Sequence, residues 1–311
     1  MLCLKMGFFD NVKKAFGFEK KDDVESHNNE DMNNKDKPAE NKGKKEIQHV
    51  HSEESVLKDR KIDEQTAIRN FRYLDELIHS GVKEIVLDSD IVLDPDEESQ
   101  YLNGIKLDLD DLAIDGNGHA IDAQGLTRIF FCTGKNIIIK NIILKNGFTK
   151  ENGGAIYNSG ELTITESTLT GNTAQESGGA IHNNEGGELT ITESTLTENT
   201  AQSEYGGGGA INNNGELTIT ESTLTGNTAG YGGAIDNNEG GELTITESTL
   251  TENTAKYRGG AIHNNEGGEL TITESTLTGN TAGYGGAINN SGENSFKIKD
   301  CKLDNNIPNN Y

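Results

Sequence analysis

The chain has 311 residues, of which 32% are hydrophobic and 5% aromatic, so any core must be thin and repetitive rather than that of an ordinary large globule. The formal net charge is −24, and residues 61–311 hold most of it, with 15 basic and 38 acidic side chains. Such a surface excludes nucleic-acid binding, which needs Lys and Arg, and no run of about 18 apolar residues offers a membrane span.

Residues 1–60 are predicted to hold a short amphipathic helix followed by a disordered, charged tether. Within residues 5–21, Phe9, Val12 and Phe16 share one helical face, and several lysines lie largely opposite. This helix either contacts a membrane surface or a partner, or is a frayed terminus without a role. Residues 22–60 have almost no large apolar side chains and cannot offset the entropy cost of ordering.

The first residues show no secretion signal, because a continuous apolar segment and a small-residue cleavage site are both missing. The default expectation is therefore a cytoplasmic protein, unless the chain is exported by another route. The three cysteines, Cys3, Cys132 and Cys301, are far apart and lack metal-ligand spacing. This argues against both a disulfide framework and a zinc site.

Residues 61–106 are predicted to form an N-terminal cap. A helix is expected over residues 63–80, with Asp63 as its N-cap and Gly81 as its stop. Its apolar stripe consists of Ala67, Phe71, Leu74 and Ile78. Short strands are expected over residues 83–87 and 91–93. A helix directly before the first strands of a solenoid would cover the open end of its core.

Residues 107–311 contain a repeat of 26 to 28 residues. One part, Gly-Gly-Ala-Ile, begins at Gly153, Gly178, Gly208, Gly232, Gly259 and Gly285. The other part, Glu-Leu-Thr-Ile-Thr-Glu-Ser-Thr-Leu-Thr, begins at Glu161, Glu188, Glu216, Glu242 and Glu269. Self-similarity at such a period is typical of a solenoid.

Each coil is predicted to be β-structure. Apolar and polar residues alternate at period two in Leu162-Thr163-Ile164, and no part of the repeat has the 3.6-residue period of a helix. The side chains expected to point inward are Leu162, Ile164, Leu169 and Ile156. Burying four large aliphatic side chains contributes roughly 6–12 kcal/mol per coil.

Degenerate copies at both ends raise the number of recognisable coils to about eight, a count that suits a solenoid of stacked repeats. The upstream copies contain Leu112, Ile114, Ile137, Ile139, Ile142 and Leu144, and the downstream copy contains Phe296, Ile298, Cys301, Leu303 and Asn306. One asparagine per coil is expected to form a structural ladder, with members about 4.8 Å apart. Its members are Asn172, Asn199, Asn227, Asn253, Asn280 and Asn306.

The pairing of Gly-Gly-Ala-Ile with a downstream Leu-Thr-Ile-x-x-Ser-x-Leu-x-x-Asn-x-Ala resembles the polymorphic outer membrane protein repeat. The segment Ala113-Ile-Asp-Gly-Asn-Gly-His-Ala-Ile-Asp122 looks like the opening turn of pectate-lyase-like β-helices and of microbial adhesin-like surface proteins. The resemblance extends over residues 107–306. It implies an all-β, right-handed parallel β-helix and an adhesive role at the cell surface.

Catalysis is not expected, because near-identical coils lack the singular arrangement of groups that a reaction needs. The irregular N-terminal coils hold the residues that a pectate-lyase-like enzyme could use, namely Asp110, Asp111, Asp115, His119, Asp122 and Arg128. A plain turn at residues 115–118 explains part of this set equally well. His182 and His263 share a repeat position with Asn212 and Asp236, which we interpret as a variable surface position.

Two exposed sets of residues are candidates for binding. The first set is a column of glutamates, one per coil. Neighbouring carboxylates repel each other by about 1 kcal/mol, and Ca²⁺ or ordinary counter-ions would relieve this repulsion. This column comprises Glu161, Glu188, Glu216, Glu242 and Glu269. Paired threonines form the second set, as a ligand-binding ladder or as ordinary exposed strand residues. They are Thr163, Thr165, Thr190, Thr192, Thr218, Thr220, Thr244, Thr246, Thr271 and Thr273.

The sequence therefore predicts a non-catalytic repeat protein that acts as a surface adhesin-like or binding module for a glycan or protein. The alternatives are a polysaccharide lyase or hydrolase of the pectate-lyase-like type and an internal scaffold tethered through residues 5–21. No cofactor is expected apart from Ca²⁺ at the glutamate column. The last coil, which ends at Ile307-Pro308, is a candidate for self-association.

Overall fold

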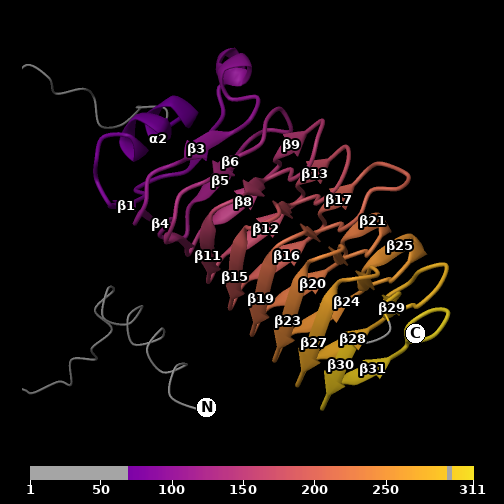
Figure 1. Cartoon of the computed structure of the whole chain (residues 1–311). Helices are drawn as coiled ribbons and strands as arrows, with labels where there is room; N and C mark the ends of the chain where they lie inside the picture. Colours follow the sequence, from indigo (N-terminus) through magenta and orange to yellow (C-terminus); the bar gives the residue numbers. More distant parts are fainter. Residues whose placement is uncertain (1–68, 293–295) are drawn as a thin grey trace, which may run out of the picture. The chain divides into compact units, whose positions relative to one another are not determined.

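A computed structural model describes residues 69–292 and 296–311, all within one compact unit that runs from Ile62 to Tyr311. These residues form a stack of coils, with the chain advancing from one end of the stack to the other (Figure 1). The helix predicted over residues 5–21 and the tether over residues 22–60 lie outside the described residues.

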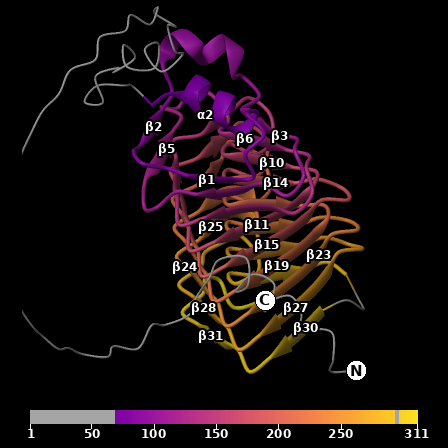
Figure 2. The same ribbon diagram turned by 90° about the vertical axis from the view of Figure 1, so that its left-hand side faces the viewer.

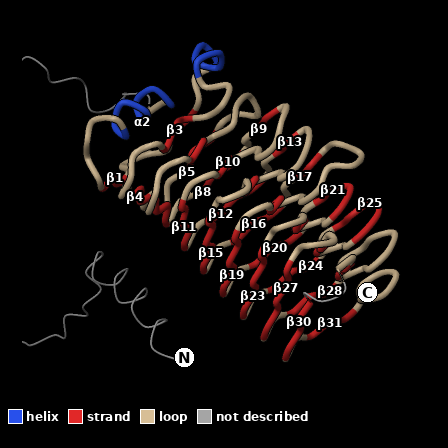
Figure 3. The backbone as a smooth tube through the Cα atoms, viewed as in Figure 1, coloured by secondary structure: helices blue, strands red, loops and turns tan. Residues whose placement is uncertain are grey.

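The coils form four sheets, in which every strand pair is parallel. We call these sheets A, B, C and D, and their strands are given in the next two paragraphs. Along a regular coil the chain passes through one strand of sheet A, then B, then D, then C, and returns to sheet A in the next coil (Figure 3). The structure is therefore the all-β parallel helix that the repeat predicts, and turns and loops join its short strands.

Sheets A and B each contain nine strands. Sheet A comprises β1 (Glu84–Val86), β4 (Ala113–Asp115), β7 (Ile137–Lys140), β11 (Glu161–Thr165), β15 (Glu188–Thr192), β19 (Glu216–Thr220), β23 (Glu242–Thr246), β27 (Glu269–Thr273) and β30 (Phe296–Lys299). Sheet B comprises β2 (Ile91–Val92), β5 (Ala120–Asp122), β8 (Ile143–Lys145), β12 (Thr168–Thr170), β16 (Thr195–Thr197), β20 (Thr223–Thr225), β24 (Thr249–Thr251), β28 (Thr276–Thr278) and β31 (Lys302–Asp304).

Sheets C and D contain eight and five strands. Sheet C comprises β3 (Ile105–Leu107), β6 (Phe130–Cys132), β10 (Ile156–Asn158), β14 (Ile181–Asn183), β18 (Ile211–Asn213), β22 (Ile235–Asn237), β26 (Ile262–Asn264) and β29 (Ile288–Asn290). Sheet D comprises β9 (Phe148–Thr149), β13 (Thr173–Ala174), β17 (Thr200–Ala201), β21 (Thr228–Tyr231) and β25 (Thr254–Arg258).

The register between neighbouring strands matches the register of the repeat. Leu162 lies beside Leu189 in the next coil and beside Ile137 in the previous one. At the far end, Leu270 lies beside Phe296, which confirms that the last degenerate copy continues the stack. Apolar residues at equivalent repeat positions therefore occupy each layer of the core, and they are identical in the regular coils.

The predicted core is confirmed. Ile156, Ile164 and Leu169 are fully buried, and Leu162 is nearly so. Since these side chains point inward at every coil, each coil covers the apolar surface of its neighbours, and no coil has to form a core alone.

Two corners of each coil contain a residue in the left-handed region. The corner between sheets A and B uses glutamate in five coils, as at Glu166 with φ 50°. The corner between sheets B and D alternates between glycine and glutamate, as at Gly171 (φ 63°) and Glu198 (φ 58°). Glu166 therefore lies in a turn that redirects the chain from β11 to β12.

A short helix closes the N-terminal end of the core, as expected. Helix α2 (Phe71–Ile78) contacts β2 and β3, and Phe71, Leu74 and Ile78 are fully buried (Figure 2). The 3-10 helix η2 (Pro95–Gln100) follows β2.

The prediction that Asp63 caps this helix is wrong, because α2 begins at Phe71 and its N-cap is Asn70. The Asn70 side chain accepts a hydrogen bond from the Tyr73 N–H at 3.0 Å and donates one to Glu97 Oε1 at 2.8 Å. The second bond joins residues 27 positions apart, so sequence reasoning could not use it.

Candidate functional site

The strands of sheet C carry one residue that changes from coil to coil. In the regular strands an isoleucine and an asparagine flank this position, and both are buried, as in Ile181 and Asn183. Because side chains alternate along a strand, the middle residue faces away from the core. We call these residues the variable column; in register they are Phe131, Tyr157, His182, Asn212, Asp236, His263 and Asn289.

Most of the variable column lies at the bottom of a groove. Although they face outward, His182, Asp236 and His263 are only 6%, 6% and 4% exposed. The prediction of a surface position at His182 and His263 is therefore wrong. The position does vary, but flanking loops cover it, and a single strand gives no sign of loops that belong to neighbouring coils.

The middle of this groove opens into a hollow of about 650 Å³. Its floor includes His182, Asn212 and Asp236 from the variable column. One wall comes from the segments that precede sheet C, and it comprises Asn152, Ser177, Tyr205 and Gly207. The other wall comes from the turns that follow sheet C, and it comprises Asn214, Asn238, Glu239, Asn265 and Glu266.

Asp236 is the centre of a polar network in the groove. Its Oδ1 accepts hydrogen bonds from His263 Nδ1 at 2.8 Å and from Asn265 Nδ2 at 3.2 Å. Its Oδ2 lies 3.4 Å from Asn212 Nδ2, at the long end of hydrogen bonding. Amide groups continue the network along the wall, from Asn265 to Asn238 and from Asn238 to Asn214. The carboxylate and the amides are thus held in fixed orientations.

Several buried polar atoms in the variable column have no hydrogen-bond partner among the described residues. They are His182 Nδ1, His263 Nε2 and Asn289 Oδ1. Burial lowers the pKa of His182, while hydrogen bonding to Asn212 and Asn184 acts in the opposite direction. His182 is therefore neutral at neutral pH. Unpaired buried polar atoms are costly, and a bound ligand would compensate them.

Aromatic rings line the groove on both sides of the hollow. Toward the N-terminal end, Phe131 stacks on Tyr157 with a centroid distance of 5.0 Å, and Tyr157 lies 5.0 Å from His182. Farther along, Tyr205 stacks on Tyr257 at 5.8 Å, and Tyr231 lies 5.4 Å from Tyr257. These stacked rings add an apolar, aromatic lining to an otherwise polar groove.

The residues proposed for a lyase or hydrolase do not form such a site. Arg128 is 2% exposed, and its guanidinium donates to the carbonyl oxygens of Gly153 and Asn152 at 2.9 and 2.8 Å. It is therefore committed to the fold and cannot act on a substrate. Asp115 pairs with Lys140 at 3.1 Å, which similarly ties a carboxylate to the neighbouring coil.

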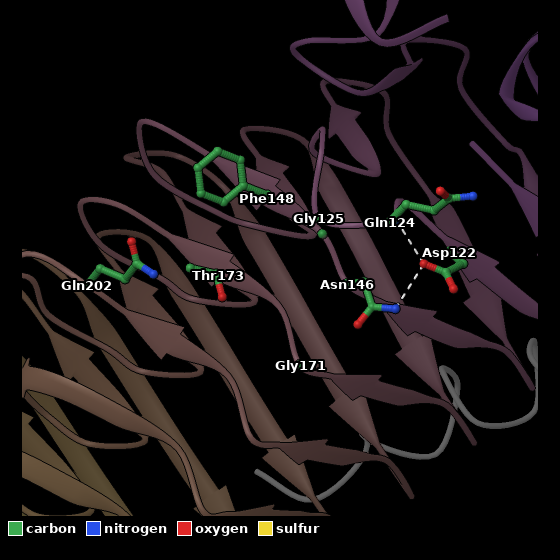
Figure 4. A pocket seen from close by; sticks show the side chains of 9 residues that line it. Asp122, Gln124, Gly125, Asn146, Phe148, Gly171, Thr173 and Gln202 are labelled. Carbon is green, nitrogen blue, oxygen red and sulfur yellow. Dashed lines mark hydrogen bonds between the residues drawn. The ribbon is translucent and has the colours of Figure 1, made fainter. Parts of the chain in front are cut away.

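Asp122 borders a second hollow, of about 390 Å³, at the edge between sheets B and D. Figure 4 shows its carboxylate accepting hydrogen bonds from Asn146 Nδ2 and the Gln124 N–H, at 2.9 and 2.8 Å. Among the described residues that line this hollow, Asp122 is the one charged side chain. A pair of carboxylates for acid and base roles is therefore not assembled there.

The six asparagines proposed as a structural ladder lie in one buried column. In the first five, the side-chain Nδ2 donates to Oδ1 of the next asparagine, as from Asn199 to Asn227 at 3.0 Å. The same Nδ2 of Asn199 also donates to the carbonyl of Leu169, and the Asn199 N–H donates to Asn227 Oδ1. Every polar atom of the amide is thereby paired, which suits its full burial.

Sequence reasoning missed a second asparagine ladder beneath sheet C. Its members donate from Nδ2 to the next Oδ1 over 2.7–2.8 Å. They are Asn158, Asn183, Asn213, Asn237, Asn264 and Asn290. The signal was present, because an asparagine stands two positions after every Gly-Gly-Ala-Ile.

The threonine and glutamate candidates all lie on sheet A. The threonines face outward and are mostly half-buried, and Thr246 hydrogen-bonds to Thr273 at 3.1 Å. The glutamates stack in register from Glu161 to Glu269 and are mostly exposed. Within residues 69–292 and 296–311, no three His, Cys, Asp or Glu side chains lie close enough to hold a metal ion. The structure thus brings the glutamates into a column without forming a Ca²⁺ cage.

Fold and site together define a parallel β-helix with constant sheets and one variable groove. The family model for the Chlamydia polymorphic membrane protein repeat matches residues 166–184 and 247–265. The chain is therefore a β-helix protein that carries polymorphic membrane protein repeats. No curated protein and no solved structure matches the chain. Neither described helix is long and apolar enough to cross a membrane.

Proposed function

We propose that this protein is a non-catalytic, adhesin-like binding module that acts at a cell surface and holds a glycan or protein ligand in the groove over sheet C. The observation that carries the proposal is the variable column at the floor of the hollow. The polymorphic membrane protein repeat supports the surface location, because that family is one of membrane proteins.

The groove is favoured over the threonine face of sheet A because of what each can recognise. The threonine face repeats the same chemistry at every coil, so it cannot distinguish one segment of a ligand from the next. The groove offers a side chain that differs between neighbouring coils, with fixed amides and unpaired ring nitrogens. A set of convergent polar groups in a concave, partly aromatic surface is typical of binding sites.

The acidic lining of the groove also argues against the uronate polymers that pectate-lyase-like enzymes cleave. Asp236, Glu239 and Glu266 line the hollow. Since a polyanionic ligand would face like charge there, its binding would be disfavoured. Together with the buried Arg128, this leaves the lyase alternative without support among the described residues.

The binding test compares the two faces in the full-length chain. A uniform-column variant replaces His182, Asp236 and His263 by asparagine, the residue that Asn212 and Asn289 already place in this column. A matched control replaces Thr190, Thr218 and Thr244 on sheet A by valine. Both variants and the parent are applied to glycan and protein arrays, after circular dichroism has established that each variant is folded.

We expect the uniform-column variant to lose at least about tenfold in affinity for the array ligand, because it loses several buried polar contacts. The threonine control should bind like the parent. A loss in the control with no loss in the uniform-column variant would move the binding site to sheet A. Brief protease treatment of intact cells tests the location: digestion of this protein beside an untouched cytoplasmic control supports a surface role, and its survival until lysis contradicts it.

A further inference from the structure

The hollow over Asp236 is lined on one side by a row of rim residues, and the coil next to Asp236 has a glycine in that row. The residues directly before each Gly-Gly-Ala-Ile stack in a row along the groove, which we call the rim row: Asn152, Ser177, Gly207, Tyr231, Arg258 and Tyr284. A Cβ atom added at Gly207 would collide with the Asp236 carboxylate. Gly207 therefore leaves room for the Asp236 carboxylate, which packs against it where a larger rim residue would have a side chain, and both residues line the hollow.

The Asp236 carboxylate has unused hydrogen-bonding capacity at one of its oxygens. Its Oδ1 already accepts two hydrogen bonds, from His263 and Asn265. Its Oδ2, which packs against Gly207, has one weak contact with Asn212. A carboxylate that is 94% buried normally pairs with a cation or with several good donors. The missing donor at Oδ2 is therefore one that a ligand can supply.

The charge of the hollow favours a positively charged donor. Glu239 and Glu266 line the same hollow as Asp236, and none of the described residues that line it is Lys or Arg. Along the rim row the first basic residue is Arg258, two coils beyond Gly207. Lys256 is paired with Glu204 at 2.6 Å. A protonated amino group brings a positive charge and several hydrogen-bond donors to Oδ2 of Asp236, the oxygen that has one weak contact.

The walls of the hollow suit a glycan better than a peptide. Tyr205 lines the hollow, and one face of its ring stacks on Tyr257. Because the residue is 69% exposed, the rest of the ring is available to the apolar face of a sugar. Fixed amides, together with the unpaired Nδ1 of His182, can bind sugar hydroxyls. A peptide could not add a strand here, because β18 and β22 both have partner strands on each side.

We propose that the hollow formed by Gly207, Tyr205 and Asp236 binds the protonated amino group of an amino sugar within a glycan, an assignment that rests on the proposed function. The amino group sits at Oδ2 of Asp236, and the sugar ring lies against Tyr205. Amides of the opposite wall bind hydroxyl groups of the same or the next sugar.

Calorimetric titration of the full-length chain with a glucosamine oligomer and with its N-acetylated counterpart tests this assignment. N-acetylation removes the charge and leaves the sugar ring, so we expect the free amine to bind at least about tenfold more tightly. Asp236→Asn should abolish this preference. Gly207→Ser should also weaken binding of the free amine, because its Cβ takes the place of the Asp236 carboxylate and displaces it from the wall of the hollow.

The control is Glu188→Gln, which removes an exposed carboxylate from sheet A and should leave binding unchanged. Equal losses in Asp236→Asn and Glu188→Gln would overturn the assignment in favour of general charge attraction. Equal affinity for the two oligomers would overturn it as well, and so would binding of a lysine peptide with no binding of either oligomer. In each of these cases the proposed function stands if the uniform-column variant still loses its array ligand, and it fails if no ligand depends on that column.

Discussion

Sheet A and sheet C belong to the same coils but differ in which of their residues are identical from one coil to the next. In sheet A the segment Glu-Leu-Thr-Ile-Thr is identical in five coils, and its outward threonines are at least partly exposed. In sheet C only the inward residues are constant, and the single outward residue differs between neighbouring coils and is buried in four of them. The difference separates the residues that build the solenoid from those that can recognise a ligand.

The constant residues are constant for a physical reason. A ladder amide such as Asn213 needs the same amide in the next coil, because each donates to its neighbour. The outward residue of sheet C has no such obligation, so it can change without disturbing the stack. A position that varies within near-identical repeats and is nevertheless buried is therefore a strong candidate for function.

The largest effect is expected beneath the groove. Asn237→Ala removes the acceptor for Asn213 Nδ2 and the donor to Asn264 Oδ1, both at 2.7 Å in the core. Leaving these groups unpaired should lower the free energy of unfolding by about 3–5 kcal/mol. Urea denaturation followed by circular dichroism measures this change. A loss below about 1 kcal/mol would mean that the ladder is not needed to hold sheet C together.

A smaller effect should come from His182 in the groove. Its pKa is lowered by burial, so below pH about 6.5 the unfolded chain binds a proton that the folded chain does not. The free energy of unfolding should therefore fall between about pH 7 and pH 5, and fall less in His182→Asn.

Thermal melting of the parent and of His182→Asn, each at about pH 7 and about pH 5, tests this pH dependence. The raised pKa of His79, which its hydrogen bonds to Asp75 and Asp108 support although burial opposes it, is common to both proteins and cancels in the difference. Identical pH dependence in the two proteins would show that the groove does not keep His182 neutral.

A third prediction concerns the corner between sheets B and D, which belongs neither to the threonine face of sheet A nor to the groove over sheet C. Glu198 adopts φ 58°, where the next coil has Gly226 at 65°. Replacing Glu198 by glycine should raise the free energy of unfolding by about 0.5–1 kcal/mol, because glycine adopts this conformation without strain. The reverse change, Gly226→Glu, should lower it by a similar amount. Chemical denaturation of the two variants measures both changes in the free energy of unfolding. A lower value for Glu198→Gly would show that the backbone of Glu198 is not strained.

The smallest effect is expected on sheet A. Thr244→Ala removes an exposed side chain in the same coil as Asn237, and the free energy of unfolding should change by less than about 0.5 kcal/mol. The same urea titration provides the comparison. A loss close to that of Asn237→Ala would show that the threonine face contributes to the fold as much as the buried ladder does.

The sequence by itself determined the coil. Its period, the inward positions of Leu162, Ile164 and Leu169, and the end copies that contain Ile137 and Phe296 all follow from alternation and repetition, which are local properties of a strand.

Only the tertiary structure decided what the outward residues experience. His182 and Asp236 are buried because loops from neighbouring coils rise beside them, and the Asp236 carboxylate fits against the wall of the hollow because Gly207, 29 positions earlier, carries no side chain. Burial by other coils depends on stacking, which joins residues distant in the sequence. The helix cap also involves a contact across the fold, because the side chain of Asn70 donates a hydrogen bond to Glu97.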